Sequence, residues 1–243
     1  MPNRKTTDPA APSSETRLGR CAVARLSKLL PLLAATLLSL PALGANAVSA
    51  PRRIAAQIVA SADNGQQPFL IVDKVGARLY VFAPDGTLRR SSPVLLGVAR
   101  GDDSVPGIGE RKIADILPFE RTTPAGRFKA EAGRNLVGED IVWVDYDAAV
   151  SMHRVRATNP RERRLERLAS STVADNRISY GCINVPAAFF DAWVSPIFKS
   201  STAPVYVLPE VRHEREVFSF LQARALAPVS PPDSALSAAL PGN

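Results

Sequence analysis

Hydrophobic and polar residues alternate along several short runs of this chain, which is the pattern of β-strands that bury one face. Phe69–Val72 and Arg78–Phe82 are two such runs, and an Asp-Gly pair after them indicates a hairpin. The run EDIVWVDYDAAVSMH at 139–153 alternates like one half-buried strand, and APVYVLP at 203–209 is typical of a closing strand. The middle of the chain is therefore predicted to be rich in β-structure.

Helical periodicity is confined to four segments around these runs. A short apolar-periodic stretch lies at 52–62, and an Arg-rich stretch at 159–175 reads as a surface helix inserted into the β domain. The segment 186–198 places three aromatic residues at helical spacing, which predicts packing on the sheet, and 211–226 reads as a charged helix. We expect one mainly β domain with a few peripheral helices.

The N-terminal part of the chain has the layout of a secretory signal peptide. Basic residues precede an apolar run from Leu29 to Leu43, and Ala45 and Ala47 follow in A-x-A spacing. An uncleaved membrane anchor is the alternative, although the run is short and broken by prolines. The predicted organisation is a lead-in and signal peptide at 1–47, a linker at 48–66, the main β domain at 67–209, a C-terminal helix at 210–226 and a disordered tail at 227–243.

Charge and composition give no support to a nucleic-acid-binding function. The 243 residues are 46% apolar and 22% charged, with a net charge of +7, an ordinary globular composition. Removal of 1–47 takes away six basic and two acidic residues and leaves a net charge of +3. Most of the basic excess is thus targeting signal, and no basic stripe with interleaved aromatic residues indicates nucleic-acid binding.

Cysteine usage raises the question of a reactive thiol. Cys21 lies in the signal segment, so the mature chain keeps only Cys182. A single cysteine cannot form an internal disulfide, and an unpaired thiol is a liability in an oxidising compartment. Cys182 is therefore either buried and inert or retained for its reactivity.

The stretch DNRISYGCINVP at 175–186 favours the second interpretation. A nucleophilic thiol needs a nearby base, and His153 is the natural candidate because His213 sits among charges on a predicted surface helix. Gly181 would permit a sharp turn, and the amides around it could face a developing oxyanion. A helix beginning just beyond this stretch would further lower the thiol pKa.

The same residues could also have purely structural, non-catalytic roles. A lone histidine on a strand is often structural, and Asn184 could simply cap the following helix. Ser179 and Tyr180 could be ordinary residues at a strand end. Two separated histidines and one cysteine do not make a zinc site, and nothing in the sequence suggests a metal or an organic cofactor.

The motifs taken together resemble the L,D-transpeptidase (YkuD-type) catalytic domain. ISYGCINV with His153 upstream, TTPAGRF at 122–128 and ARLYVF at 77–82 carry the resemblance, which covers about 69–208. It implies a β-sandwich-like fold and a variant motif, because Tyr180 replaces the histidine that usually precedes Gly-Cys. The gap of 25 residues between His153 and Ser179 is also longer than usual, and the Arg-rich stretch accounts for the excess.

The resemblance implies an exported enzyme, periplasmic or associated with the cell wall, that acts on peptidoglycan stem peptides. Cys182 would be the nucleophile and His153 the general base and acid, while Ser179, Tyr180, Gly181 and Asn184 would shape the site and its oxyanion hole. An amine acceptor would give a 3–3 cross-link. An L,D-carboxypeptidase or amidase on the same scaffold is the alternative, and a non-catalytic wall-binding domain is a lesser one.

Partners follow from the same resemblance. Stem peptides would be donor and acceptor, no nucleic acid is expected, and contact with a membrane would occur only through an uncleaved signal segment. Stem peptides carry carboxylates, so arginines close in sequence to the proposed catalytic elements are candidate substrate ligands. These candidates are Arg154, Arg156 and Arg177.

Overall fold

The computed structural model describes residues 49–225. The predicted signal peptide and the predicted disordered tail lie outside the described residues. Within 49–225, no helix is both long enough and apolar enough to cross a membrane.

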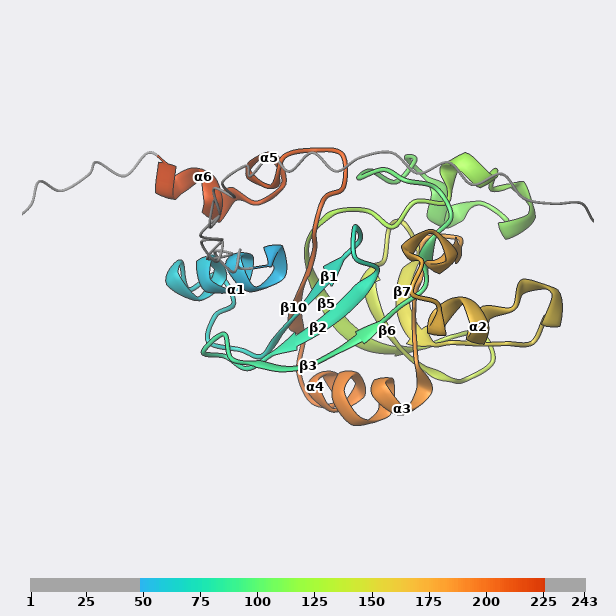
Figure 1. The fold of residues 1–243 in the computed structure, drawn as a ribbon, viewed down its shortest axis with the longest axis horizontal. Helices are drawn as coiled ribbons and strands as arrows, with labels where there is room; N and C mark the ends of the chain where they lie inside the picture. The colour runs from blue at the N-terminus through green and yellow to red at the C-terminus, as the bar shows by residue number, and fades with distance from the viewer. Residues whose placement is uncertain (1–48, 226–243) are drawn as a thin grey trace, which may run out of the picture. The chain divides into compact units, whose positions relative to one another are not determined.

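The fold is built on one eight-stranded sheet with the order β3-β2-β1-β10-β5-β6-β7-β9 (Figure 1). Its pairs are antiparallel except β1–β10 and β7–β9, which are parallel. A separate short pair joins β4 to β8. The strands are β1 (Phe69–Asp73), β2 (Arg78–Phe82), β3 (Leu88–Pro93), β4 (Leu96–Gly97), β5 (Gly126–Arg134), β6 (Asp140–Asp145), β7 (Val150–Arg154), β8 (Arg177–Ser179), β9 (Ile183–Val185) and β10 (Ala203–Val207).

Short helices surround this sheet. They are α1 (Ala50–Ala60), α2 (Arg164–Ala169), α3 (Ala187–Phe189), α4 (Ser195–Phe198), α5 (Glu214–Val217) and α6 (Ser219–Ala225). A π-helical turn at Phe190–Val194 joins α3 to α4. Single 3-10 turns lie at Ile108–Glu110, Ile113–Asp115, Pro118–Glu120, Pro160–Glu162 and Val173–Asn176. The prediction of a mainly β domain with a few peripheral helices is confirmed.

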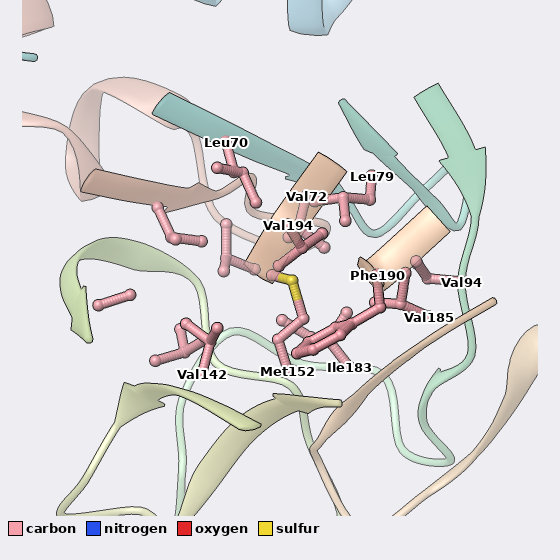
Figure 2. Close-up of a cluster of buried hydrophobic side chains, with 14 of the residues drawn as sticks. Leu70, Val72, Leu79, Val94, Val142, Met152, Ile183, Val185, Phe190 and Val194 are labelled. Carbon is pink, nitrogen blue, oxygen red and sulfur yellow. The ribbon is translucent and has the colours of Figure 1, made fainter. Parts of the chain in front are cut away.

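The strand β5 joins the two halves of the sheet. Its first part, 126–130, pairs with β10, and its second part, 131–134, pairs with β6. Side chains from both halves enter one buried cluster, which means that the halves face each other across it. Figure 2 shows this core, in which Met152 of β7 lies among residues of β1, β6 and β9 and of the α3–α4 segment. The arrangement agrees with the sandwich-like architecture expected from the sequence.

A second core lies on the other face of the β1–β10 half. Alternation along β1 sends Leu70 to the first core and Ile71 to the second. The helix α1 covers this second core with Ile54 and Ile58, one turn apart on its buried face. Figure 1 shows α1 together with α5 and α6 on the side opposite α3 and α4. The segment expected to be a linker at 48–66 is thus partly a packed helix of the domain.

Three predicted elements differ from those observed. The Arg-rich stretch at 159–175, predicted as one surface helix, forms only the six-residue α2 between two 3-10 turns, because Arg163 adopts a positive φ of 49° before α2 begins. The run 139–153, predicted as one strand, is the hairpin of β6 and β7, because Ala149 adopts a positive φ of 52° and its N–H closes a turn onto Tyr146. The predicted helix at 210–226 is broken into α5 and α6 at Phe218, which takes an extended conformation and is buried in the second core. Burial of that aromatic ring outweighs helix propensity at this position.

Candidate active site

The parallel pair β7–β9 builds the centre of the site. Met152 lies opposite Ile183 in the register, and both side chains are fully buried in the first core. Because side chains alternate along a strand, their neighbours in sequence point to the opposite face. Four polar side chains meet there: Ser151, His153, Cys182 and Asn184.

The thiol of Cys182 and the imidazole of His153 lie close enough to shift the pKa of each other, and the thiol also donates to the carbonyl oxygen of Ala149 at 3.7 Å. Burial raises the pKa of the half-buried thiol, but His153 and, to a smaller extent, Ser151 together lower it by more, so the pKa of Cys182 lies below its ordinary value. Burial lowers the pKa of His153, whereas Cys182 and the carbonyl of Arg154 together raise it by more, and the pKa of the imidazole lies above its ordinary value. Each group therefore shifts the pKa of the other in the direction that stabilises the charged form of that group.

The orientation of His153 is fixed by the backbone. Its Nδ1 lies 2.8 Å from the carbonyl oxygen of Arg154. A carbonyl only accepts, so Nδ1 carries a proton in every charge state, and the Nε2 atom is the one that exchanges a proton. This arrangement leaves the titrating nitrogen on the side of the thiol and of Asn184.

Ser151 is a site residue that sequence reasoning missed. Its Oγ lies 3.6 Å from Cys182 Sγ, and the contact lowers the pKa of the thiol. The signal was present, because Ser151 precedes His153 by two positions on one strand and must share its face. The register with β9 was needed to place Cys182 beside it.

The turn that carries Cys182 is closed by Ser179. Its hydroxyl donates to the carbonyl of Cys182 at 2.6 Å and accepts the N–H of Gly181 at 3.1 Å. Gly181 has a φ of +124°, and a Cβ there would lie 2.7 Å from the Thr122 carbonyl oxygen, so glycine is required. The N–H of Gly181, expected to face an oxyanion, is engaged by Ser179 in this structure.

The TTPAGRF stretch anchors this turn from the other side. The fully buried Thr123 donates its hydroxyl to the Gly181 carbonyl at 2.8 Å and accepts the N–H of Gly97 at 2.9 Å. Sequence comparison marked this stretch by resemblance only. The structure gives it a physical role, since Thr123 ties the nucleophile turn to β4.

A cavity of about 410 Å³ opens beside the pair. The inserted segment between β7 and β8 forms much of its wall, while Tyr180 and Ile113 line another part. The ring of Tyr180 stacks on the guanidinium of Arg121, 3.8 Å away. The lining residues are Ile113, His153, Arg156, Thr158, Asn159, Glu162, Arg164, Ser179, Tyr180, Cys182 and Asn184.

Asn184 does not cap the following helix. Pro186 occupies the cap position of α3, and no side chain caps that helix. The strand β9 also separates Cys182 from the start of α3, so a helix N-terminus does not carry the thiol, contrary to the sequence expectation. Asn184 instead turns its amide toward His153, with Nδ2 at 3.5 Å from Nε2.

Only one of the three candidate substrate arginines lines the cavity. Arg156 does so, and it also pairs with Glu139 at 3.5 Å. Arg154 is directed away to Asp191, at 2.8 Å from its Nε, and packs over the ring of Phe190. Arg154 contributes its backbone carbonyl to the site, not its guanidinium.

Arg177 is a buried structural residue, which corrects its assignment as a substrate ligand. Its guanidinium donates to Glu210 at 2.6 Å and to the Lys74 carbonyl at 2.8 Å. Lys74 is itself fully buried and donates to Asp102 at 2.7 Å. These four charges form a network behind the nucleophile turn, and nearness in sequence to Ser179 did not reveal which way Arg177 points.

Parts of the chain resemble solved L,D-transpeptidases. The catalytic domain of the Enterococcus faecium L,D-transpeptidase matches at 17% identity and a TM-score of 0.33, over 59% of this chain and 98% of that one. Mycobacterium tuberculosis L,D-transpeptidase 1 matches at 16% identity and a TM-score of 0.30, over 58% of this chain and 61% of the other.

A third match is the helical cell shape determining protein Pgp2 of Campylobacter jejuni, at 13% identity and a TM-score of 0.40. The match covers 60% of this chain and 49% of Pgp2, so the chain spans about half the length of that protein. No protein-family model and no curated protein sequence matches the chain.

The arrangement has the parts of a cysteine acyl-transfer site. The Cys182 thiol lies beside an imidazole of fixed tautomer, and both line a cavity large enough for part of a peptide. Among residues 49–225, no three His, Cys, Asp or Glu side chains are grouped so as to hold a metal ion.

Proposed function

We propose that this protein is an exported cysteine L,D-transpeptidase that acts on peptidoglycan stem peptides. The observation that carries the proposal is the Cys182–His153 pair, with the His153 Nδ1 proton held by the Arg154 carbonyl, at the wall of the cavity. The motif SYGCIN and the signal-like segment at 1–47 supply the substrate class and the export by resemblance.

The first half-reaction follows from this pair. The thiolate attacks the carbonyl carbon of the third stem residue and forms a C–S bond, while the carbonyl electrons move to the oxygen. Collapse of this intermediate breaks the amide bond, and Nε2 of His153 gives its proton to the departing D-alanine amine. The product is a thioester on Cys182, and the imidazole is left neutral.

The second half-reaction decides the activity. The neutral imidazole accepts a proton from the incoming nucleophile as that nucleophile attacks the thioester carbon. The C–S bond then breaks, and its electron pair leaves with Cys182 as the thiolate. A side-chain amine of a second stem gives a 3–3 cross-link, whereas water gives an L,D-carboxypeptidase. Tyr180, which lines the cavity where a histidine is usual in the resembled family, is the residue that bears on this choice.

Purified protein incubated with disaccharide-tetrapeptides, with products read by mass spectrometry, tests the proposal. Dimers lighter by one D-alanine than two monomers are expected, and they should be absent with Cys182→Ala and with His153→Gln. His213→Gln is the matched control, because it removes the other histidine at the start of α5. Monomers that only lose D-alanine would establish the carboxypeptidase instead. Unchanged substrate with folded protein would refute both activities.

A further inference from the structure

The segment inserted between β7 and β8 reaches Asn184, the residue beside His153, through one side chain. Arg164, the first residue of α2, donates from Nη1 to the Oδ1 of Asn184 at 2.6 Å. The guanidinium is mostly shielded from solvent, with 14% of the side chain exposed, and its Nε donates to Glu162 at 2.5 Å. Arg164 is thus held from one side by Glu162 and holds Asn184 on the other.

This contact fixes the orientation of the Asn184 amide. A guanidinium has only donors, so the oxygen of the amide must face it, and the NH2 group must face the other way. That group lies 3.5 Å from His153 Nε2 and 3.3 Å from the carbonyl oxygen of Cys182. The backbone of Asn184 is held independently by two hydrogen bonds with Leu95. Arg164 therefore fixes the orientation of the Asn184 side-chain amide, whereas the position of the Asn184 backbone does not depend on it.

An NH2 group directed at Nε2 favours the neutral imidazole. It can donate to the lone pair of Nε2, whereas it is repelled once that nitrogen carries a proton. The positive charge of Arg164 acts in the same direction and lowers the pKa of His153, against the larger raising effect of Cys182. The other charged groups lining the cavity near His153 are Glu162, which is paired with Arg164, and Arg156.

We propose that Arg164 is a positioning residue, which holds the Asn184 amide with its NH2 group toward His153 Nε2 and so keeps the imidazole ready to exchange its proton. The inference rests on the proposed function only in taking His153 as the acid and base of the reaction. The insertion is then part of the catalytic apparatus as well as a wall of the cavity.

The test uses the full-length protein and reads the titration of the His153 imidazole by NMR, without substrate. The chain has only two histidines, so His213→Gln assigns the signals. In Arg164→Met the titration midpoint is expected to move to higher pH, because the amide can then turn its oxygen toward protonated Nε2. Arg164→Lys keeps a charged donor and should return the midpoint toward that of the wild type.

Asn184→Ala separates positioning from simple charge repulsion. If Arg164 acts through the amide, the shift caused by Arg164→Met should shrink markedly in the Asn184→Ala background. A shift of full size in that background, or no shift in Arg164→Met, would overturn the proposal. Circular dichroism of each variant confirms that it is folded.

Activity distinguishes this inference from the proposed function. In Arg164→Met, release of D-alanine should fall about tenfold in kcat with little change in KM, as expected for loss of one oriented hydrogen bond to a reacting group. If Arg164→Met shifts the midpoint but the wild type releases no D-alanine, the positioning role stands and the proposed function is refuted. If the wild type and Arg164→Met release D-alanine equally and have the same midpoint, the proposed function stands and the positioning role is refuted.

Discussion

Ser151 Oγ lies 3.6 Å from Cys182 Sγ, on the neighbouring parallel strand. The register of β7 and β9 produces this contact, since His153 is opposite Asn184 and Ser151 is therefore beside the residue two positions earlier. The hydroxyl can donate to the thiolate, which the His153 hydrogen bond also stabilises.

Ser151→Ala is expected to raise the pKa of Cys182 and to slow its alkylation by iodoacetamide near neutral pH by about tenfold, the loss of roughly one hydrogen bond to a charged group. Ser151→Thr keeps a hydroxyl and serves as the matched control. The measurement is the alkylation rate as a function of pH. An identical profile for Ser151→Ala and the wild type would show that the hydroxyl does not stabilise the thiolate.

His153→Gln should have a larger effect on the same profile. Burial raises the pKa of Cys182, and His153 makes the largest contributions to lowering it, ahead of Ser151, so loss of the imidazole should raise this pKa. Thiolate should then be lost at neutral pH and should return only as the pH rises beyond the ordinary range of a thiol, about 8.5. His213→Gln should leave the profile unchanged. A low thiol pKa that persists in His153→Gln would mean that another group stabilises the thiolate.

Gly181→Ala should destabilise the domain and misplace the nucleophile. The φ of +124° and the 2.7 Å approach to the Thr122 carbonyl act together at this position. We expect a loss of about 2–4 kcal/mol in the free energy of unfolding, measured by urea denaturation. Gly138→Ala is the control, because Gly138 also has a positive φ, +80°, but a Cβ there meets nothing within 4 Å. Equal losses in the two variants would exclude the steric contribution.

The buried carboxylate Asp102 should make the fold sensitive to acid. Burial raises its pKa, but Lys74 and the N–H groups of Glu210, Val211 and Arg212 lower it by more, to about 2 from 3.8. A carboxyl with a depressed pKa stabilises the fold above its unfolded pKa. This stabilisation is lost as the pH falls from about 4 to about 2.

Asp102→Asn should remove that acid dependence and should leave the buried ammonium of Lys74 without its closest counter-charge. A loss of about 3–5 kcal/mol at neutral pH is expected, as for other broken buried ion pairs. Asp103→Asn is the matched control, because Asp103 is the next residue in the chain and its carboxylate side chain is 75% exposed. Unfolding free energy measured against pH checks both statements. A variant as stable as the wild type would show that the network does not depend on this carboxylate.

Local sequence determined much of the site, and long-range register determined the rest. The Gly-Cys turn indicated Cys182, and His153 was chosen as its base because His213 sits among charges on a predicted surface helix. Thr123 and Arg164 were not singled out, because their partners Gly181 and Asn184 are distant in sequence and only the folded chain brings them together. Arg177 was misassigned because its neighbours in sequence say nothing about the direction of a long side chain on a short strand.

The fold was predictable to a similar extent. Period-two runs predicted β1 and β2 within a residue, and the aromatic spacing predicted that the segment after Pro186 packs on the sheet. The turn inside the run 139–153 was missed because its residue with positive φ is Ala149, whereas glycine or asparagine usually marks such a position in a sequence. Tertiary burial, not propensity, also broke the C-terminal helix at Phe218.

Parallel pairing of β7 with β9 has a consequence for the order of events during folding. Ser151 and Cys182 are 31 positions apart, and the parallel pair requires a long crossover that includes α2. In the unfolded chain, Cys182 is an ordinary thiol with no base beside it. The lowering of its pKa by His153 and Ser151 therefore begins only when this distant pairing is complete.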